Sequence, residues 1–330
     1  MRVGFLIGLG LVILLVAWQG FAAVGDRLAD AGWAILLVAL FIPPDLLLRT
    51  ASWQLLFAPG RAPRFVDTAL AMWIGSSVNF LLPVASVGGE FVKARILALK
   101  SVRGVDAAAS VVLDKTVQAI SVLLWALIGT AILAVVAPAG EPMVAVAYVG
   151  AALMALGIAG FVLVQNIGAF AIVARPAARM SRSVRWRSLM EGAADLDAVI
   201  RSLYRQPGAI AVSTVIRLAK RALMAGEVWM IAWLLGHPIG LEQAVMLNSL
   251  AVALRSAAFG VPGGLGVQEG GYVMVGALVG LPPDVMLATS LLTRVGELIE
   301  GLPGLVAWQV AEGKVFLGRR RKALSSPPPP

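Results

Sequence analysis

Residues 79–90 read NFLLPVASVGGE, and residues 258–269 read AFGVPGGLGVQE. In both stretches a proline and two adjacent glycines interrupt an apolar segment, and a glutamate follows the proline by seven residues. Proline and glycine break or end helices, and the apolar pieces on either side are too short to cross a bilayer comfortably. Each stretch therefore predicts a re-entrant or broken helical hairpin inside a membrane. The expected break residues are Pro83, Gly88, Gly89, Pro262, Gly263 and Gly264.

An internal repeat connects the two stretches through one constant offset in residue number. The residues that this offset equates include Pro83 with Pro262, Glu90 with Glu269, Lys115 with Arg294, and Gln118 with Glu297. Each half thus contains a broken helix, a glutamate, and a basic residue 25 positions further along. Three full crossings are expected between the hairpins, so the halves would be inverted in the membrane, as in many secondary transporters. Chance resemblance in a chain rich in glycine and proline is the alternative.

The rest of the chain predicts an all-α polytopic membrane protein. Of its 330 residues, 59% are hydrophobic and 14% are charged, whereas soluble domains have about 25% charged residues. The expected full crossings are residues 3–24, 31–57, 105–136, 142–165, 207–235 and 285–312. The hydrophobic segment at 3–24 has only Arg2 before it and is long for a cleaved signal peptide, which is the alternative.

A single transmembrane domain over residues 1–318 is expected, with halves at about 1–137 and 142–313. Residues 319–330 contain four consecutive basic residues and end in four prolines, which predicts a basic disordered tail. Residues 166–206 contain seven arginines with apolar residues between them. This segment predicts a basic interfacial helix pair on the cytoplasmic face; a plain cytoplasmic loop that follows the charge bias is the alternative.

The distribution of basic residues predicts the orientation of the chain. The net charge is +9, and most lysines and arginines fall in loops that would lie on one side of the membrane. Because cytoplasmic loops have the basic excess, we expect six crossings in a bacterial inner membrane with both termini in the cytoplasm. No nucleic-acid-binding motif accompanies the charge, so nucleic acid is not an expected partner. Whether copies of the chain associate is left open.

Charged residues inside the predicted crossings indicate a binding site, because buried charges in a membrane are costly and by default suggest function. The crossing 207–235 also has a one-sided charged stripe, which should face protein or water. Pairing that only stabilises the structure, such as Arg294 with Glu297, is the alternative. The chain has no cysteine and one histidine, so neither a metal nor a cofactor is expected. The expected substrate-binding residues are Glu90, Lys115, Arg255, Glu269, Arg294 and Glu297.

Several motifs resemble the flippase-like integral membrane family that includes the transmembrane region of lysylphosphatidylglycerol synthase. The residues behind this resemblance are Pro83, Gly88, Gly89, Glu90, Lys93, Arg95 and the stretch 262–271. Stretches 266–272 and 302–309 further resemble a subgroup associated with hopanoid-biosynthesis loci. Many members have a Glu–Arg pair in the third crossing, where this chain has Asp114 and Lys115, which leaves the role of that pair open.

The resemblance implies lipid translocation or lipid-linked transport. It does not imply aminoacyl transfer, because the soluble synthase domain has no counterpart after residue 312. We therefore expect a lipid flippase or transporter, not an enzyme, that binds an anionic or polar headgroup or a polycyclic lipid near the midplane. The alternatives are a membrane-embedded lipid-modifying partner and a scaffold for lipid-biosynthesis enzymes. No nucleophile–base constellation supports the former, and the latter predicts that single intramembrane charges can be neutralised without loss of function.

Overall fold

A computed structural model describes residues 32–82, 88–136, 142–166, 184–258, 261 and 264–325, and every regular element in those ranges is helical. The helices are η1 (Gly32–Phe41), α3 (Ile42–Gln54), α4 (Phe65–Leu81), α5 (Gly88–Leu99), α6 (Gly104–Val136), α7 (Pro142–Asn166), α9 (Val184–Tyr204), α10 (Pro207–Leu234), α11 (Leu241–Ala257), α12 (Val267–Leu278) and α13 (Pro283–Ser325). The predicted all-helical class is confirmed. The expected crossing at 3–24, the break residues Pro83, Pro262 and Gly263, and the last residues 326–330 lie outside the described part.

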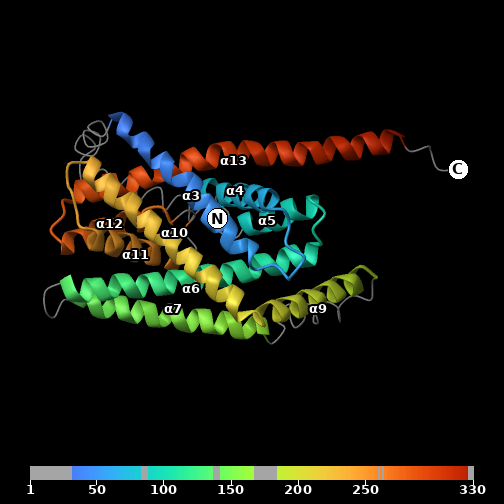
Figure 1. Ribbon diagram of the computed structural model, residues 1–330, viewed down its shortest axis with the longest axis horizontal. Helices are drawn as coiled ribbons and strands as arrows, with labels where there is room; N and C mark the ends of the chain where they lie inside the picture. Colours follow the sequence, from blue (N-terminus) through green and yellow to red (C-terminus); the bar gives the residue numbers. More distant parts are fainter. Residues whose placement is uncertain are drawn as a thin grey trace.

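The two broken regions both contain a pair of short helices. In Figure 1, α4 and α5 lie side by side toward the right of the bundle, whereas α11 and α12 lie side by side toward the left. The long helices connect the two regions: α6 packs against α11, and α13 packs against α4. Each half thus places its long helix against the first short helix of the other half.

The protein has two apolar cores in its described part. One contains buried residues of α3, α4, α5, α6 and α9, including Trp53, Met72 and Leu97. The other contains buried residues of α10, α11, α12 and α13, including Ile231 and Met246, together with Val38 of η1 and Leu133 of α6. Helices α10 and α3 contact each other and run obliquely across the molecule in Figure 1. These two helices therefore lie where the halves meet.

Three described helical segments are long and apolar enough to cross a membrane: Leu36–Gln54, Gly104–Val136 and Pro142–Gln165. Helix α7 shows the clearest lipid-facing surface, because only 6% of its apolar window is buried inside the protein. Its side chains Leu153 and Leu156 are 64% and 70% exposed. Large contiguous apolar surfaces of this kind are rare on soluble monomers and indicate contact with lipid or another protein. Helices α10 and α13 are also long, but charged residues interrupt their apolar sequence.

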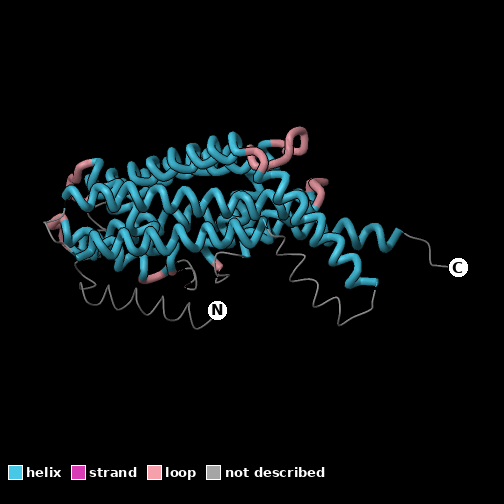
Figure 2. The backbone as a smooth tube through the Cα atoms, turned by 90° about the horizontal axis from the view of Figure 1, so that it is seen from below, coloured by secondary structure: helices cyan, strands magenta, loops and turns pink. Residues whose placement is uncertain are grey.

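Two expectations about boundaries need correction. The last crossing was expected to end at 312 and a disordered tail to begin at 319, yet α13 continues to Ser325. Lysine, arginine and alanine are good helix formers, so the basic run prolongs the helix. The expected crossing 31–57 starts as a 3₁₀ helix and becomes an α-helix at Ile42, with prolines in its first turn, where proline is tolerated. Helix α9 and the end of α13 project beyond the bundle at the same end (Figure 2).

Candidate functional site

The first-half cluster is a group of charged side chains from α5, α6 and α10: Glu90, Lys93, Asp114, Lys115 and Arg217. Glu90 is the third residue of α5, where the helix N-terminus favours negative charge. Its carboxylate lies 2.8 Å from Lys115 Nζ and 3.1 Å from Lys93 Nζ. Asn79 of α4 donates its side-chain amide to Glu90 Oε1 at 3.1 Å. The broken region thus holds its glutamate with two cations and an amide.

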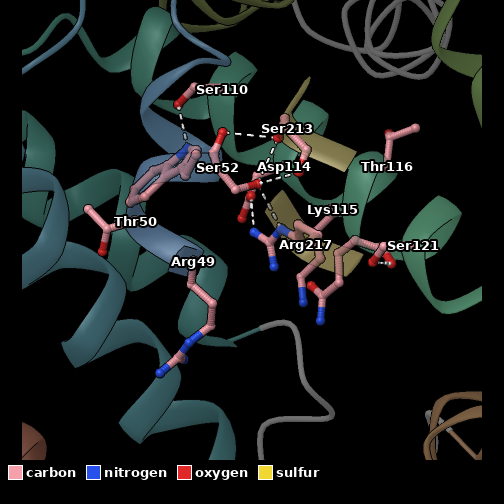
Figure 3. Close-up of polar contacts among 12 residues, drawn as sticks. Arg49, Thr50, Ser52, Ser110, Asp114, Lys115, Thr116, Ser121, Ser213 and Arg217 are labelled. Atoms are coloured by element: carbon pink, nitrogen blue, oxygen red, sulfur yellow. Dashed lines mark hydrogen bonds and ion pairs between the residues drawn. The ribbon is translucent and has the colours of Figure 1, made fainter. Parts of the chain in front are cut away.

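Asp114 continues this cluster toward α10. Its side chain is fully buried and pairs with Arg217 through one oxygen, while Lys93 Nζ lies 3.6 Å from the other. Arg217 also donates from Nε to Ser52 Oγ of α3 at 3.1 Å, and the Ser52 and Ser213 hydroxyls form a hydrogen bond with each other. Figure 3 shows the Arg217 guanidinium pointing at Asp114 from the neighbouring helix. Together these contacts tie α3, α6 and α10 to one another.

The second-half cluster contains Arg255 of α11, Gln268 and Glu269 of α12, and Arg294 and Glu297 of α13. The Arg294 Nε lies 3.0 Å from Glu269 Oε1, and its Nη1 lies 3.2 Å from Glu297 Oε2. The other oxygen of Glu297 accepts from Arg255 at 2.5 Å. Glu269 is fully buried, and its second oxygen accepts from the backbone N–H of Gly266 at 2.7 Å. This contact caps the first turn of α12.

A central cluster lies between the other two and contains Asp45 and Arg49 of α3, Lys220 of α10 and Glu300 of α13. Arg49 donates to Glu300 and to the Ser76 hydroxyl, both at 2.6 Å, and its Nε forms an ion pair with Asp45 at 2.7 Å. Lys220 Nζ lies 3.1 Å from the second oxygen of Asp45. Since α10 holds Arg217 and Lys220, and α13 holds Glu297 and Glu300, these two helices connect all three clusters.

The two glutamate–cation pairs occupy equivalent places in the chain. The offset that takes Glu90 to Glu269 also takes both ends of α5 to the ends of α12, and the start of α6 to the start of α13. Glu90 and Glu269 are each the third residue of their helix, and each binds the basic residue 25 positions further along. The distances in the two pairs are 2.8 Å and 3.0 Å. The repeat seen in the sequence is therefore also a repeat of helix boundaries and ion pairs.

The members of these clusters differ in exposure. The side chains of Asp114 and Glu269 are fully buried, while those of Lys115 and Arg255 are 30% and 25% exposed. Removing charges from water costs several kcal/mol per ion, and paired carboxylates and cations offset part of that cost. Lys115 and Arg255 are therefore the cations of the first-half and second-half clusters that water reaches most readily.

All six expected site residues lie in the two outer clusters, two in the first half and four in the second. The sequence predicts that the charged stripe of α10 faces protein or water, and its residues Arg217, Arg221 and Glu227 are buried. Sequence reasoning did not assign Asp45 and Arg49 to any site, although two charges in an apolar helix were a signal. Among the described residues, no three side chains gather to hold a metal ion.

Comparison with known proteins found one family. A family model described as the lysylphosphatidylglycerol synthase TM region matches residues 4–301. This range includes both broken regions and all three clusters. Comparisons with curated proteins and with solved structures found no match.

Proposed function

Because this chain belongs to the family of the lysylphosphatidylglycerol synthase transmembrane region, we propose that it is a lipid flippase or lipid transporter. It binds an anionic or polar headgroup between its two halves and moves the lipid across the bilayer, in the handling of phospholipids or hopanoids. The family match makes it a membrane protein tied to lipid handling. In this proposal the chain makes and breaks no covalent bond.

One observation supports the proposal above all others: the repeated glutamate–cation pair at the start of two short helices. Each pair lies where apolar helices are interrupted, and half-helix ends of this kind bind substrate in many transporters. Ion pairs in a membrane persist only if their charges are offset. An anionic headgroup can replace the glutamate as the partner of the cation. A headgroup with both charges can pair with either residue.

The charges of the loops that flank the two hairpins support an inverted repeat. Helices α4 and α5 are preceded and followed by loops that contain Arg61, Arg64 and Arg103. Helices α11 and α12 are flanked by turns at 235–240 and 279–282 that contain no lysine or arginine. The positive-inside rule then places the first hairpin on the cytoplasmic side and the second on the opposite side. Both chain ends lie in the cytoplasm in this arrangement, and the membrane is the bacterial inner membrane.

The direct test is reconstitution into vesicles that contain trace fluorescent lipids with different headgroups. An impermeant quencher reports how fast each lipid leaves the inner leaflet. We expect faster movement of at least one lipid with an anionic or zwitterionic headgroup than in protein-free vesicles. If no lipid moves faster with monodisperse protein, the transporter proposal fails and the scaffold alternative gains support.

A further inference from the structure

Arg221 of α10 differs from every other buried arginine in the described chain, because no carboxylate pairs with it there. Its residue is 8% exposed, and its Nε donates to Ser121 Oγ of α6 at 3.2 Å. Arg217, one turn earlier, pairs with Asp114. Both oxygens of the nearby Asp45 already bind other cations. The two Nη groups of Arg221 thus have no hydrogen-bond acceptor among the described residues.

The internal repeat relates Ser121, the partner of Arg221, to a carboxylate in the other half. The offset that relates the start of α6 to the start of α13 equates Ser121 with Glu300. In one place an arginine of α3, Arg49, meets a carboxylate on α13. At Ser121 an arginine of α10, Arg221, meets a hydroxyl on α6, so the repeat relates the two acceptor positions and not the two arginines. The first arginine is neutralised by protein, and the second is not.

The buried charges around Arg221 do not balance. The first-half cluster, the central cluster, Arg221 and the buried Glu227, which interacts electrostatically with Lys220, together contain six cations and five carboxylates, so one positive charge is not neutralised within this group. The cations are Arg49, Lys93, Lys115, Arg217, Lys220 and Arg221; the carboxylates are Asp45, Glu90, Asp114, Glu227 and Glu300. An excess of buried charge is unfavourable unless a ligand offsets it.

We propose that Arg221, held in place by Ser121, is an anion subsite that binds the phosphate of a lipid headgroup. The Nε is fixed by the hydroxyl, which itself donates to the Gln118 carbonyl at 2.7 Å. The remaining guanidinium edge has the planar donors that bind phosphate oxygens in pairs. The subsite rests on the proposed lipid transport and identifies a phosphate ester as the substrate class. Figure 3 shows Ser121 on α6 beyond Asp114 and Lys115.

The test compares two substitutions with a matched control. Arg221→Gln removes the cation, and Ser121→Asp supplies the carboxylate that the other half has at Glu300. Arg201→Gln, an exposed position on α9, removes one arginine elsewhere. Each protein is purified in detergent, and its melting temperature is measured with short-chain phosphatidylglycerol, with inorganic phosphate, and with the uncharged diacylglycerol of the same chain length.

We expect phosphatidylglycerol, but not diacylglycerol, to raise the melting temperature of the unmutated protein and of Arg201→Gln. Arg221→Gln and Ser121→Asp should need at least about tenfold more lipid for the same rise, a loss of about 1.4 kcal/mol. Ser121→Asp should also melt higher than the unmutated protein without lipid, since its carboxylate neutralises Arg221. Should Ser121→Asp not fold, the comparison of Arg221→Gln with Arg221→Lys tests the subsite. Arg221→Lys keeps the charge and should retain partial binding.

Unchanged lipid dependence in both variants, or no stabilisation of the unmutated protein by any phosphate compound, would overturn the subsite. If inorganic phosphate acts as strongly as the lipid, and only when Arg221 is present, the anion subsite stands and its ligand is free phosphate. Failure of lipid transport is a separate result, since it shows as absent lipid movement in vesicles while binding to Arg221 persists.

Discussion

Arg49 and Arg95 show how differently one residue type behaves in this protein. Arg49 is buried and has three partners. The side chain of Arg95 is 50% exposed and pairs with Glu312 near the end of the bundle. A buried pair leaves an uncompensated charge when one partner is removed, whereas an exposed pair contributes little to stability. We therefore expect the ion pairs of Arg49 in the central cluster to stabilise the fold.

We predict that Arg49→Gln lowers the free energy of unfolding by about 3–5 kcal/mol, because Asp45 and Glu300 then lack their shared cation. Arg95→Gln should cost less than about 1 kcal/mol. Denaturant unfolding in detergent, followed by tryptophan fluorescence, measures both. Equal effects of the two substitutions would contradict the central position of Arg49.

Glu227 is buried like Arg49 but differs from it in its lack of an ion-pair partner among the described residues. It is 7% exposed, and no described residue forms a hydrogen bond or ion pair with it. A Cβ atom at Gly296 of α13 would lie 3.5 Å from its Oε1. Burying a charge without a partner is costly, so we predict that Glu227→Gln leaves the free energy of unfolding unchanged or raises it. Glu90→Gln, which removes paired charge, is the comparison and should destabilise. A loss of more than about 2 kcal/mol in Glu227→Gln would show that this carboxyl has a stabilising partner.

At the scale of elements, close backbone contact keeps the first hairpin together. The Gly89 N–H donates to the Asn79 side chain at 2.9 Å. A Cβ at Gly75 would lie 2.7 Å from Gly89 O, and one at Gly89 would lie 2.6 Å from the Asn79 side chain. Helices α4 and α5 can therefore approach this closely only with glycine at both positions.

Gly75→Ala should destabilise the protein by about 1–3 kcal/mol, since the hairpin must open to fit the methyl group. The matched control is Gly157→Ala on α7, where nothing lies within 4 Å of the added atom; there alanine should be neutral or slightly stabilising. Melting temperatures in one detergent compare the two. A Gly75→Ala protein as stable as the control would show that α4 and α5 are not in close contact.

The elements themselves could be predicted well from the sequence. The two short apolar pieces expected on either side of Pro83 correspond to α4 and α5, because proline and glycine interrupt the apolar run there. The end of α13 could not be placed, since a basic run suits both a helix and a disordered tail. The link between Arg49 and Glu300 spans 251 positions, and no local pattern encodes a contact at that separation. It depends on α13 packing against α4 and η1, which are both neighbours of α3, and only the tertiary structure determines this packing.

At the scale of the whole molecule, the proposed orientation makes a prediction about access. The chain contains no cysteine, so single cysteines can be labelled without background. His237→Cys, between α10 and α11, should react with an impermeant thiol reagent in intact cells. Ala62→Cys and Ser202→Cys should react only after permeabilisation. Labelling of Ala62→Cys or Ser202→Cys in intact cells would reverse the orientation.

The whole-molecule symmetry could be predicted only in part. The constant offset between the halves follows from the spacing in the sequence. The pairing of Glu90 with Lys115 and of Glu269 with Arg294 is seen only in the structure. The exchange of packing between halves, in which α6 meets α11 and α13 meets α4, does not follow from that spacing either. That exchange depends on small residues such as Gly129, whose Cβ would collide with Ser249 of α11. Small residues at helix contacts allow close approach in membranes, but they do not identify the partner helix.

The most direct test of the account is the initial rate of lipid movement in vesicles by Glu90→Gln and Glu269→Gln, with Arg95→Gln as the control. All three proteins must first be monodisperse in detergent. We predict that both glutamate variants lose at least about tenfold in rate, equal to about 1.4 kcal/mol of barrier, while the control moves lipid at the unmutated rate. Unchanged rates in well-folded Glu90→Gln and Glu269→Gln would contradict the claim that the repeated pairs move lipid.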